Sequence, residues 1–249
     1  MMETGLETAG VVARQEVSIQ LPLGIRLPNT ATFGNFIAGR NIEALDYLGE
    51  AVCQEEGQSI YLWGGGGCGK SHLLQAASHF VAGRGGATAY IPLAHAAELA
   101  PGIFEGLEAM RLVCIDDVDR IAGQEDWETG LFHLYNRLRE QDALMIFAAR
   151  VSPGAVDIGL PDLRSRLAWG MVLHLEQPAD EHKVGILQQW ARERGMQMPD
   201  EVALYLLRHF SRDLHALLAV LDRLDYASQV AQRRLTVPFV REIAVGDPE

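Results

Sequence analysis

The sequence SIYLWGGGGCGKSHLLQAA at residues 59–77 decides the fold of this chain. Five residues typical of a buried strand lead into a glycine-rich turn, and a helical pattern follows it. The eight residues from Gly64 to Ser71 fit the phosphate-loop pattern G-x-x-x-x-G-K-[ST]. Glycines permit positive φ, so successive backbone N–H groups can point at phosphate oxygens. A flexible glycine linker is the alternative, but the strand before the glycines and the helix after them favour a nucleotide site.

The polar residues of this loop have separate roles in that interpretation. A helix that begins near Lys70 offers free N–H groups and the positive end of its dipole to an anion. Lys70 can reach the β- and γ-phosphates, and the Ser71 hydroxyl can hold Mg²⁺. The loop residues that we expect to contact the nucleotide are Gly66, Gly67, Cys68, Gly69, Lys70, Ser71 and His72.

Length, composition and charge narrow the class of protein. The 249 residues suggest one large domain, or a medium domain with a small one. No apolar run approaches the roughly 18 residues of a membrane span, and no signal-peptide pattern is present, so we expect a cytoplasmic protein without membrane contact. The net charge of −12 argues against a strong DNA-binding surface, which needs clustered Lys and Arg. The three cysteines are widely spaced and fit reduced thiols.

Strand and helix patterns alternate along the chain up to about residue 177. We predict strands at residues 59–63, 88–92, 112–115, 144–149 and 171–175. Strands without a polar face that alternate with helices indicate a parallel sheet covered on both sides. Later residues carry only helical patterns, at 181–194, 200–210, 212–233 and a short last helix begun by Thr236. The expected architecture is an α/β core of five parallel strands at residues 31–177 and a small all-α domain at 178–249.

The residues before the core read differently from the rest. Residues 1–19 lack periodicity, and residues 20–28 read QLPLGIRLP. Two prolines and a glycine exclude a regular helix or a central strand there. Alternating apolar residues on an extended segment suggest a peptide that docks into another surface. Composition alone fits equally well a tail that folds back onto its own domain.

Two acidic residues follow the apolar run at residues 112–115. A strand would bring Asp116 beside the Mg²⁺ position at Ser71, and Asp117 would orient a water. An exposed acidic turn is the alternative. The pair follows the phosphate loop by about forty-five residues, which favours the magnesium interpretation.

Several motifs occur in the order of an AAA+ ATPase core. They are the phosphate loop, Asp116-Asp117, FHLYN at 132–136, LRSRLAWG at 163–170 and SRDL at 211–214. From about residue 32 onward the chain resembles the AAA+ module of the bacterial replication initiator DnaA. The initiator's C-terminal helix-turn-helix domain has no counterpart here. Together with the peptide at residues 20–25, this resembles the Hda family of DnaA-related regulatory inactivators.

The resemblance implies roles that the residues alone do not establish. Arg166 resembles the arginine finger, which is offered to the nucleotide of a neighbouring subunit; otherwise it would be a surface arginine that caps a helix. Arg212 resembles the sensor arginine of a helical lid; otherwise it would be a first-turn residue beside Asp213. Asn35, Phe36 and Ile37 resemble the segment beside adenine, although core packing also explains Phe36. The residues that would bind the DNA polymerase III β sliding clamp are Gln20, Leu21, Leu23 and Ile25.

One departure from the family pattern concerns hydrolysis. The strand at 144–149 ends Phe147-Ala148-Ala149, where the family places a Ser, Thr or Asn that helps to position the attacking water. A missing hydrogen-bonding group at such a site costs about 10²–10³ in rate. We therefore expect this subunit to bind ADP or ATP but to hydrolyse ATP weakly.

The resulting hypothesis is a regulator that tethers to the clamp and inserts Arg166 into ATP-bound DnaA to trigger hydrolysis, which prevents re-initiation. A self-sufficient AAA+ ATPase of the loader or remodeller type is the alternative. A P-loop kinase is disfavoured by the helical lid with Arg166 and Arg212. The resemblance is also compatible with a homo-oligomer.

Overall fold

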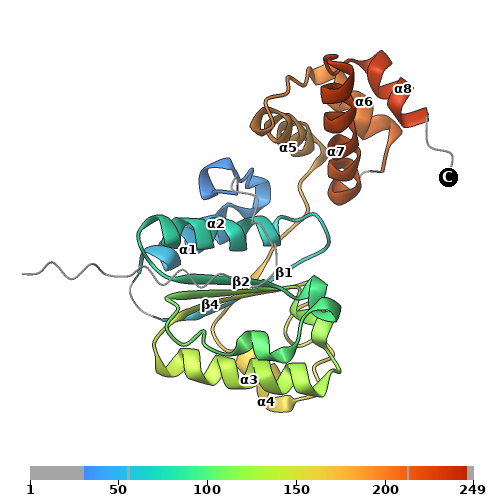
Figure 1. Cartoon of the computed structure of the whole chain (residues 1–249). Coiled ribbons are helices and arrows are strands. Elements are labelled where there is room, and N and C mark those ends of the chain that lie inside the picture. The colour runs from blue at the N-terminus through green and yellow to red at the C-terminus, as the bar shows by residue number, and fades with distance from the viewer. Residues whose placement is uncertain (1–30, 55–56, 212, 246–249) are drawn as a thin grey trace, which may run out of the picture.

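The computed structural model describes residues 31–54, 57–211 and 213–245. Its N-terminal part is a parallel sheet of five strands in the order β2-β3-β4-β1-β5, with helices on both faces (Figure 1). The strands are β1 Ser59–Trp63, β2 Thr88–Pro92, β3 Leu112–Asp116, β4 Leu144–Ala149 and β5 Met171–His174. The predicted α/β class and the predicted parallel sheet are confirmed.

The helices of this part lie in two layers. Helices α1 and α2 cover one face of the sheet, and α3 and α4 cover the other (Figure 1). Their bounds are α1 Ile42–Cys53, α2 Lys70–Gly83, α3 Glu125–Glu140 and α4 Pro161–Leu167. Between β2 and β3 the chain forms only the short 3₁₀ helices η3 Leu93–Glu98 and η4 Pro101–Phe104. Pro101, Gly102 and Gly106 explain why no regular helix forms there, because proline and glycine both disfavour a helix interior.

The core is built from alternate residues of the strands. Tyr61 packs with Phe147 in the layer beneath α3, while the next residue, Leu62, packs in the layer beneath α1 and α2. Both β1 residues are almost fully buried. This alternation follows from the two-residue period of a strand.

Strand β5 departs from the prediction of a fully buried strand. Met171 and Val172 are 38% and 37% exposed. β5 lies at the edge of the sheet and pairs only with β1 within the described residues. Its apolar composition suggested burial, but the order of the strands decides which strand lies at the edge.

The C-terminal part is a separate helical layer with its own apolar core. Its helices are α5 Asp180–Glu193, α6 Asp200–His209, α7 Leu214–Ala231 and α8 Val237–Val245. Leu187, Leu206 and Leu221 meet in its centre, fully buried. Before α8, the Thr236 hydroxyl accepts a hydrogen bond from the Phe239 N–H at 3.4 Å, as a capping threonine does. Within the described residues, no helix combines the length and the apolar character that crossing a membrane requires.

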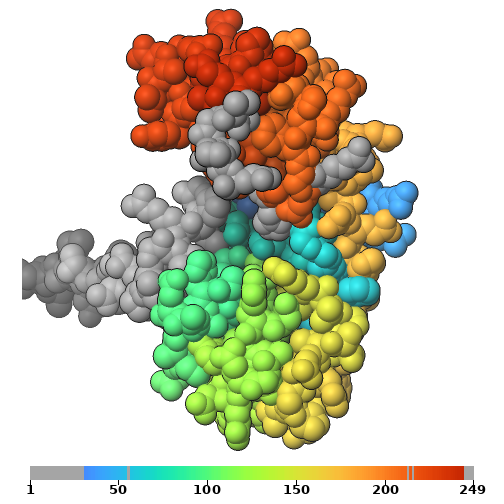
Figure 2. All heavy atoms as spheres, turned by 90° about the vertical axis from the view of Figure 1, so that its right-hand side faces the viewer, coloured from blue at the N-terminus to red at the C-terminus, as the bar shows by residue number. Residues whose placement is uncertain are grey.

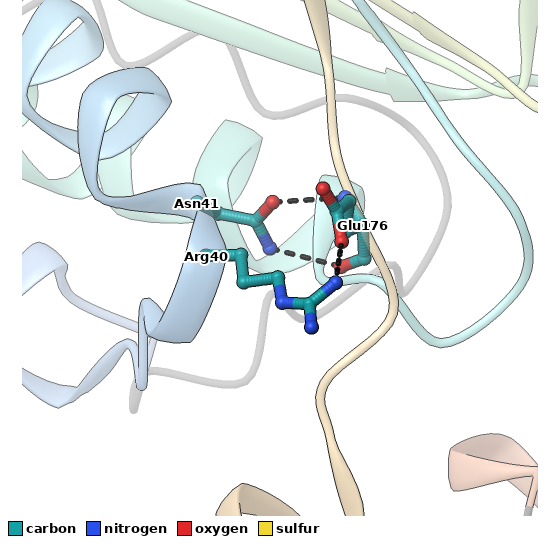
Figure 3. A network of polar contacts seen from close by, with 3 residues as sticks. All are labelled: Arg40, Asn41 and Glu176. Carbon is teal, nitrogen blue, oxygen red and sulfur yellow. Dashed lines mark hydrogen bonds and ion pairs between the residues drawn. The ribbon is translucent and has the colours of Figure 1, made fainter.

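The segment that joins the two parts is held against the start of α1 (Figure 3). The Asn41 amide donates to the Glu176 carbonyl at 2.9 Å, and the Glu176 N–H donates to Asn41 Oδ1 at 2.8 Å. Asn41 is buried, so this reciprocal pair satisfies polar groups that water does not reach. Arg40 adds an exposed ion pair to Glu176 at 3.1 Å, which contributes little. The two hydrogen bonds between Asn41 and Glu176 therefore fix the position of the chain between β5 and α5.

Candidate nucleotide-binding site

A cavity of about 440 Å³ lies between the phosphate loop and the helical layer. Its lining residues come from the phosphate loop and the start of α2 on one side and from α5 and α7 on the other. Apart from Arg212, every residue that we predicted for nucleotide binding lines it. These residues are Asn35, Phe36, Ile37, Gly66, Gly67, Cys68, Gly69, Lys70, Ser71 and His72. Figure 2 shows the helical part, in orange and red, above the part that contains the sheet.

The loop glycines are required by space as well as by backbone conformation. Gly69 precedes α2 with a φ of +97°, and a Cβ there would lie 2.5 Å from the ring of Phe36. A Cβ on Gly64 would lie 2.3 Å from the Leu175 carbonyl oxygen. Such contacts leave no room for a side chain. The glycine-rich stretch is therefore a packed turn, which a flexible linker would not be.

Lys70 folds back over this turn. Its buried ammonium donates to the carbonyl oxygens of Gly64 at 2.7 Å and Gly65 at 3.1 Å. Its remaining contact is a weak one to Cys68 Sγ at 3.6 Å. An ammonium has three donors, so a phosphate oxygen can take the place of the sulfur without loss of the two carbonyl bonds. Ser71, the next residue, exposes its hydroxyl on the cavity wall.

Asp116 ends β3 and is buried. One of its carboxylate oxygens accepts from the Tyr90 hydroxyl at 2.8 Å, and the other accepts from the Asp117 N–H at 2.9 Å. Burial, together with the charge of Asp116, raises the pKa of Tyr90, so its hydroxyl stays protonated and donates. Each oxygen keeps a further lone pair for a magnesium ion that arrives with phosphates. Ser71 lines the cavity, whereas Asp116 is 2% exposed and does not line it. Across the described residues, no group of three or more His, Cys, Asp or Glu could hold a metal by itself.

Asp117 lines the cavity. Its backbone adopts the left-handed conformation, with a φ of 55°. Burial is the main cause that raises the pKa of its carboxyl, and Asp116 and Asp119 add to it. Lys70 and Arg120 act in the opposite direction. Asp117 and Lys70 line the same cavity, and the charge of Lys70 favours the ionised form of the Asp117 carboxyl. The role of Asp117 in orienting a water stays a prediction.

The segment at residues 32–37, which we predicted to lie beside adenine, is hydrogen-bonded to the C-terminal helical part. Thr32 and Asn35 cap η1 (Phe33–Asn35) reciprocally, with bonds of 2.8 Å and 3.1 Å. The Asn35 amide also donates to Glu193 at 2.6 Å, and Gln189 donates to the Asn35 carbonyl at 2.6 Å. His72 contacts the Thr32 carbonyl at 3.0 Å, and burial lowers its pKa. The segment therefore joins the start of α2 to α5.

Several cavity residues were missed by the sequence analysis. Helices α5 and α7 supply one wall, through Ile186, Gln189, Trp190, Glu193, Leu214 and Leu218. Their apolar spacing indicated only an amphipathic helix, and nothing local says which face meets the core. Arg120 and Arg150 also line the cavity. Arg150 could have been found, because it directly follows β4 at the edge where the phosphate loop lies.

Arg166 does not line this cavity within the described residues. It lies near the end of α4, half-buried, with its guanidinium carbon 5.7 Å from the centre of the Trp169 ring. Arg212 and the peptide residues Gln20, Leu21, Leu23 and Ile25 lie outside the described residues. Their roles stay predictions.

A buried glutamate fixes the start of the helix that carries Arg166. The carboxylate of Glu128 accepts from the N–H groups of Gly123 at 2.6 Å, Gly159 at 3.0 Å and Leu160 at 2.7 Å. Leu160 is the residue before α4, so these bonds join α3 to the first turn of α4. A glutamate on an amphipathic helix reads as exposed, and the sequence analysis did not single it out.

We expect Glu128→Gln to lower the free energy of unfolding by about 1–3 kcal/mol, because an amide has one acceptor oxygen and leaves a buried N–H group unpaired. Denaturation by urea measures this. Glu125→Gln is the matched control, because Glu125 is exposed in the first turn of the same helix. Equal stability of the two variants would show that the Glu128 bonds do not hold α4.

Two family models match this chain on either side of the joining segment. The bacterial DnaA ATPase domain matches residues 103–174, and the lid domain of Hda matches residues 180–244. The chain belongs to the Hda/DnaA-related family. The helical layer is thus the lid of an AAA+ protein, and the predicted boundary at residue 177 lies between the two matches.

Solved structures share the fold of this chain. Domain III of DnaA from Thermotoga maritima aligns with a TM-score of 0.75 at 21% identity, over 87% of this chain and 96% of that one. AMPPCP-bound DnaA from Aquifex aeolicus aligns with a TM-score of 0.63 at 25% identity, over 78% of this chain and 65% of that one. A RuvB variant from Thermotoga maritima shares the fold, with a TM-score of 0.62 at 16% identity over 86% of this chain and 71% of that one.

Proposed function

We propose that this Hda/DnaA-related protein is a regulator of replication initiation. It binds ADP or ATP and the DNA polymerase sliding clamp, and it stimulates ATP hydrolysis by DnaA through Arg166, which prevents re-initiation. One observation carries the proposal. A phosphate-loop cavity and an arginine in the finger motif occur on one chain, and the arginine is not part of that cavity.

Adenine nucleotide is the ligand that the relatives and the cavity favour. The DnaA of Aquifex aeolicus was solved with AMPPCP, an ATP analogue. In this chain, Lys70 and the N-terminus of α2 would bind the phosphates, and Ser71 with Asp116 would hold Mg²⁺. When bound, the ion supplies positive charge to the phosphate oxygens. Because α5 lines the same cavity and bonds to Asn35, the nucleotide would join the lid to the core.

Hydrolysis at this chain's own cavity is expected to be weak. Strand β4 ends in Ala148 and Ala149, both fully buried, so it offers no hydroxyl or amide to the attacking water. Asp117 alone would then orient that water. The bound nucleotide would act on the position of the lid, and the chemistry would take place in the cavity of DnaA.

Arg166 would supply what the DnaA cavity lacks. Its guanidinium carries a permanent charge and a planar fork of N–H donors that fits phosphate oxygens. Charge spreads over the γ-phosphate oxygens during transfer, and an arginine from a neighbouring subunit stabilises it. The negative charge of this chain, −12, agrees with a protein that reaches DNA through its partners.

Hydrolysis assays distinguish this proposal from the self-sufficient ATPase. ATP turnover is measured for the chain alone, with DnaA, and with DnaA and clamp-loaded DNA. We expect slow turnover alone and a large increase only when DnaA, clamp and DNA are all present. Fast turnover by the chain alone, unchanged by DnaA, would instead establish a loader or remodeller ATPase.

The clamp tether is tested by changing Gln20 and Leu21 together to alanine. Since a few residues carry most of the energy of such an interface, we expect clamp affinity to fall roughly tenfold or more. Affinity for ADP should stay unchanged. Surface plasmon resonance on immobilised clamp measures the effect, and Val17 and Ser18, both changed to alanine, are the control. Unaltered clamp binding by the first variant would show that the peptide was misread.

A further inference from the structure

Trp169 is an exposed aromatic residue with two arginines over its ring. It is 58% exposed, although large aromatic side chains are usually well buried. The guanidinium carbon of Arg139 lies 4.4 Å from the ring centre and that of Arg166 lies 5.7 Å from it. Both distances are within the range of about 6 Å over which a cation is attracted to an aromatic face. Arg139 comes from the last turn of α3, so the ring lies between two elements.

The backbone beneath this ring is held in place. The Trp169 N–H donates to the Arg166 carbonyl at 3.0 Å, which closes the end of α4. The next residue, Gly170, has a φ of +106°, and a Cβ there would lie 2.2 Å from the Ser59 carbonyl oxygen at the start of β1. On the inner side of α4, Leu163 and Leu167 are fully buried. The indole therefore projects from a fixed base beside the side chain of Arg166.

We propose that Trp169 and Arg139 are positioning residues for Arg166, an inference that rests on the proposed function. A free arginine side chain samples many rotamers, and fixing it in one of them costs conformational entropy. This cost adds to the barrier for transfer of the γ-phosphate. The cation–π contact with Trp169, at 5.7 Å, limits those rotamers and leaves the N–H donors of the guanidinium available to bond a phosphate. Arg139 lies closer to the Trp169 ring than Arg166 does, at 4.4 Å, and holds this exposed ring from α3. Neither residue touches the reacting atoms in this role.

An exposed tryptophan flanked by arginines could instead serve as a stacking platform for single-stranded nucleic acid. The chain is strongly acidic, with 33 Asp and Glu against 21 Lys and Arg, which opposes the backbone contacts that such binding needs. The observations therefore favour the positioning role, and nucleic-acid binding becomes an outcome of the test.

The experiment uses the full chain with DnaA, clamp and DNA. It measures the maximal rate of stimulated ATP hydrolysis and the concentration of this chain that gives half of it. We expect Trp169→Leu to lower the maximal rate about two- to fivefold, because it removes one exposed cation–π contact. The half-maximal concentration should stay unchanged. Trp169→Phe should keep most of the rate because it keeps an aromatic face. Arg139→Gln should lower the rate in the same direction. Tyr226→Leu, at an exposed aromatic on α7, is the control.

Four results would overturn the inference. The first is an unchanged maximal rate in Trp169→Leu. The second is an equal loss in Trp169→Phe and Trp169→Leu, which would show that the aromatic face is not needed. The change could fall only on the half-maximal concentration, which would make Trp169 a contact residue. Trp169→Leu could lose binding of a single-stranded oligonucleotide without any change in hydrolysis. If Arg166→Ala also keeps full stimulation, the proposed function fails together with the inference. If Arg166→Ala abolishes stimulation and Trp169→Leu does not reduce it, only the inference fails.

Discussion

Replacing Arg166 with alanine is expected to reduce the ATP hydrolysis that this chain stimulates in DnaA by about 10³-fold or more. The reason is that an arginine finger supplied in trans increases the rate by about 10³–10⁵. Binding of ADP and ATP to the variant should match the unaltered protein, since Arg166 does not line the cavity described for this chain. Phosphate release in the presence of DnaA, clamp and DNA measures the first effect, and a fluorescent ADP analogue measures the second.

The matched control is Arg164→Ala. Arg164 lies on the same helix two residues earlier and is exposed, so the variant removes the same charge from nearly the same place. We expect it to keep most of the stimulation. Equal losses in the two variants would point to the overall charge of α4. A loss of nucleotide binding in Arg166→Ala would show that its role was assigned wrongly.

Lys70→Ala is expected to have the next largest effect. A hydrogen bond to a charged group contributes about 1.5–3 kcal/mol, so affinity for ADP and ATP should fall roughly 10- to 100-fold. Isothermal titration calorimetry measures the change. Stimulation of DnaA should fall as well if the nucleotide sets the position of the lid.

Two further variants make this result interpretable. The Lys70 ammonium also holds the carbonyls of Gly64 and Gly65, so Lys70→Gln, which keeps donors, tests whether the loop itself has collapsed. Arg208→Ala, at an exposed arginine on α6, controls for the loss of one positive charge. Lys70→Ala that still binds ADP and ATP with unaltered affinity would contradict the phosphate-loop interpretation.

Features with a local cause could be predicted from the sequence. The buried strand at 144–149 follows from its apolar run. The packed turn at 64–71 follows from its glycines, which permit the positive φ that such a turn needs. The residues that this turn brings together, from Gly66 to His72, line the cavity, and their contact with a nucleotide stays a prediction. The first helix of the lid was predicted within one residue at each end, because its apolar period is local too.

Features that depend on how distant elements pack could not be predicted. The exposure of Met171 follows from the order of the strands, which no local pattern contains. Gln189 reaches the Asn35 carbonyl only because the lid packs there. Glu128 is buried through bonds to a loop about thirty residues away in sequence, at Gly159. The finger role of Arg166 came from the family resemblance, since its own surroundings describe only a half-buried arginine on a short helix.

The most direct test of the central claim locates the ATP that is hydrolysed. In a single-turnover experiment without free nucleotide, labelled ATP is bound beforehand either to DnaA or to this chain, and the other protein is added together with clamp-loaded DNA. The account predicts rapid conversion to ADP only when the label is on DnaA, and no such conversion with Arg166→Ala. Rapid conversion of ATP carried by this chain, with the label on DnaA left intact, would contradict it.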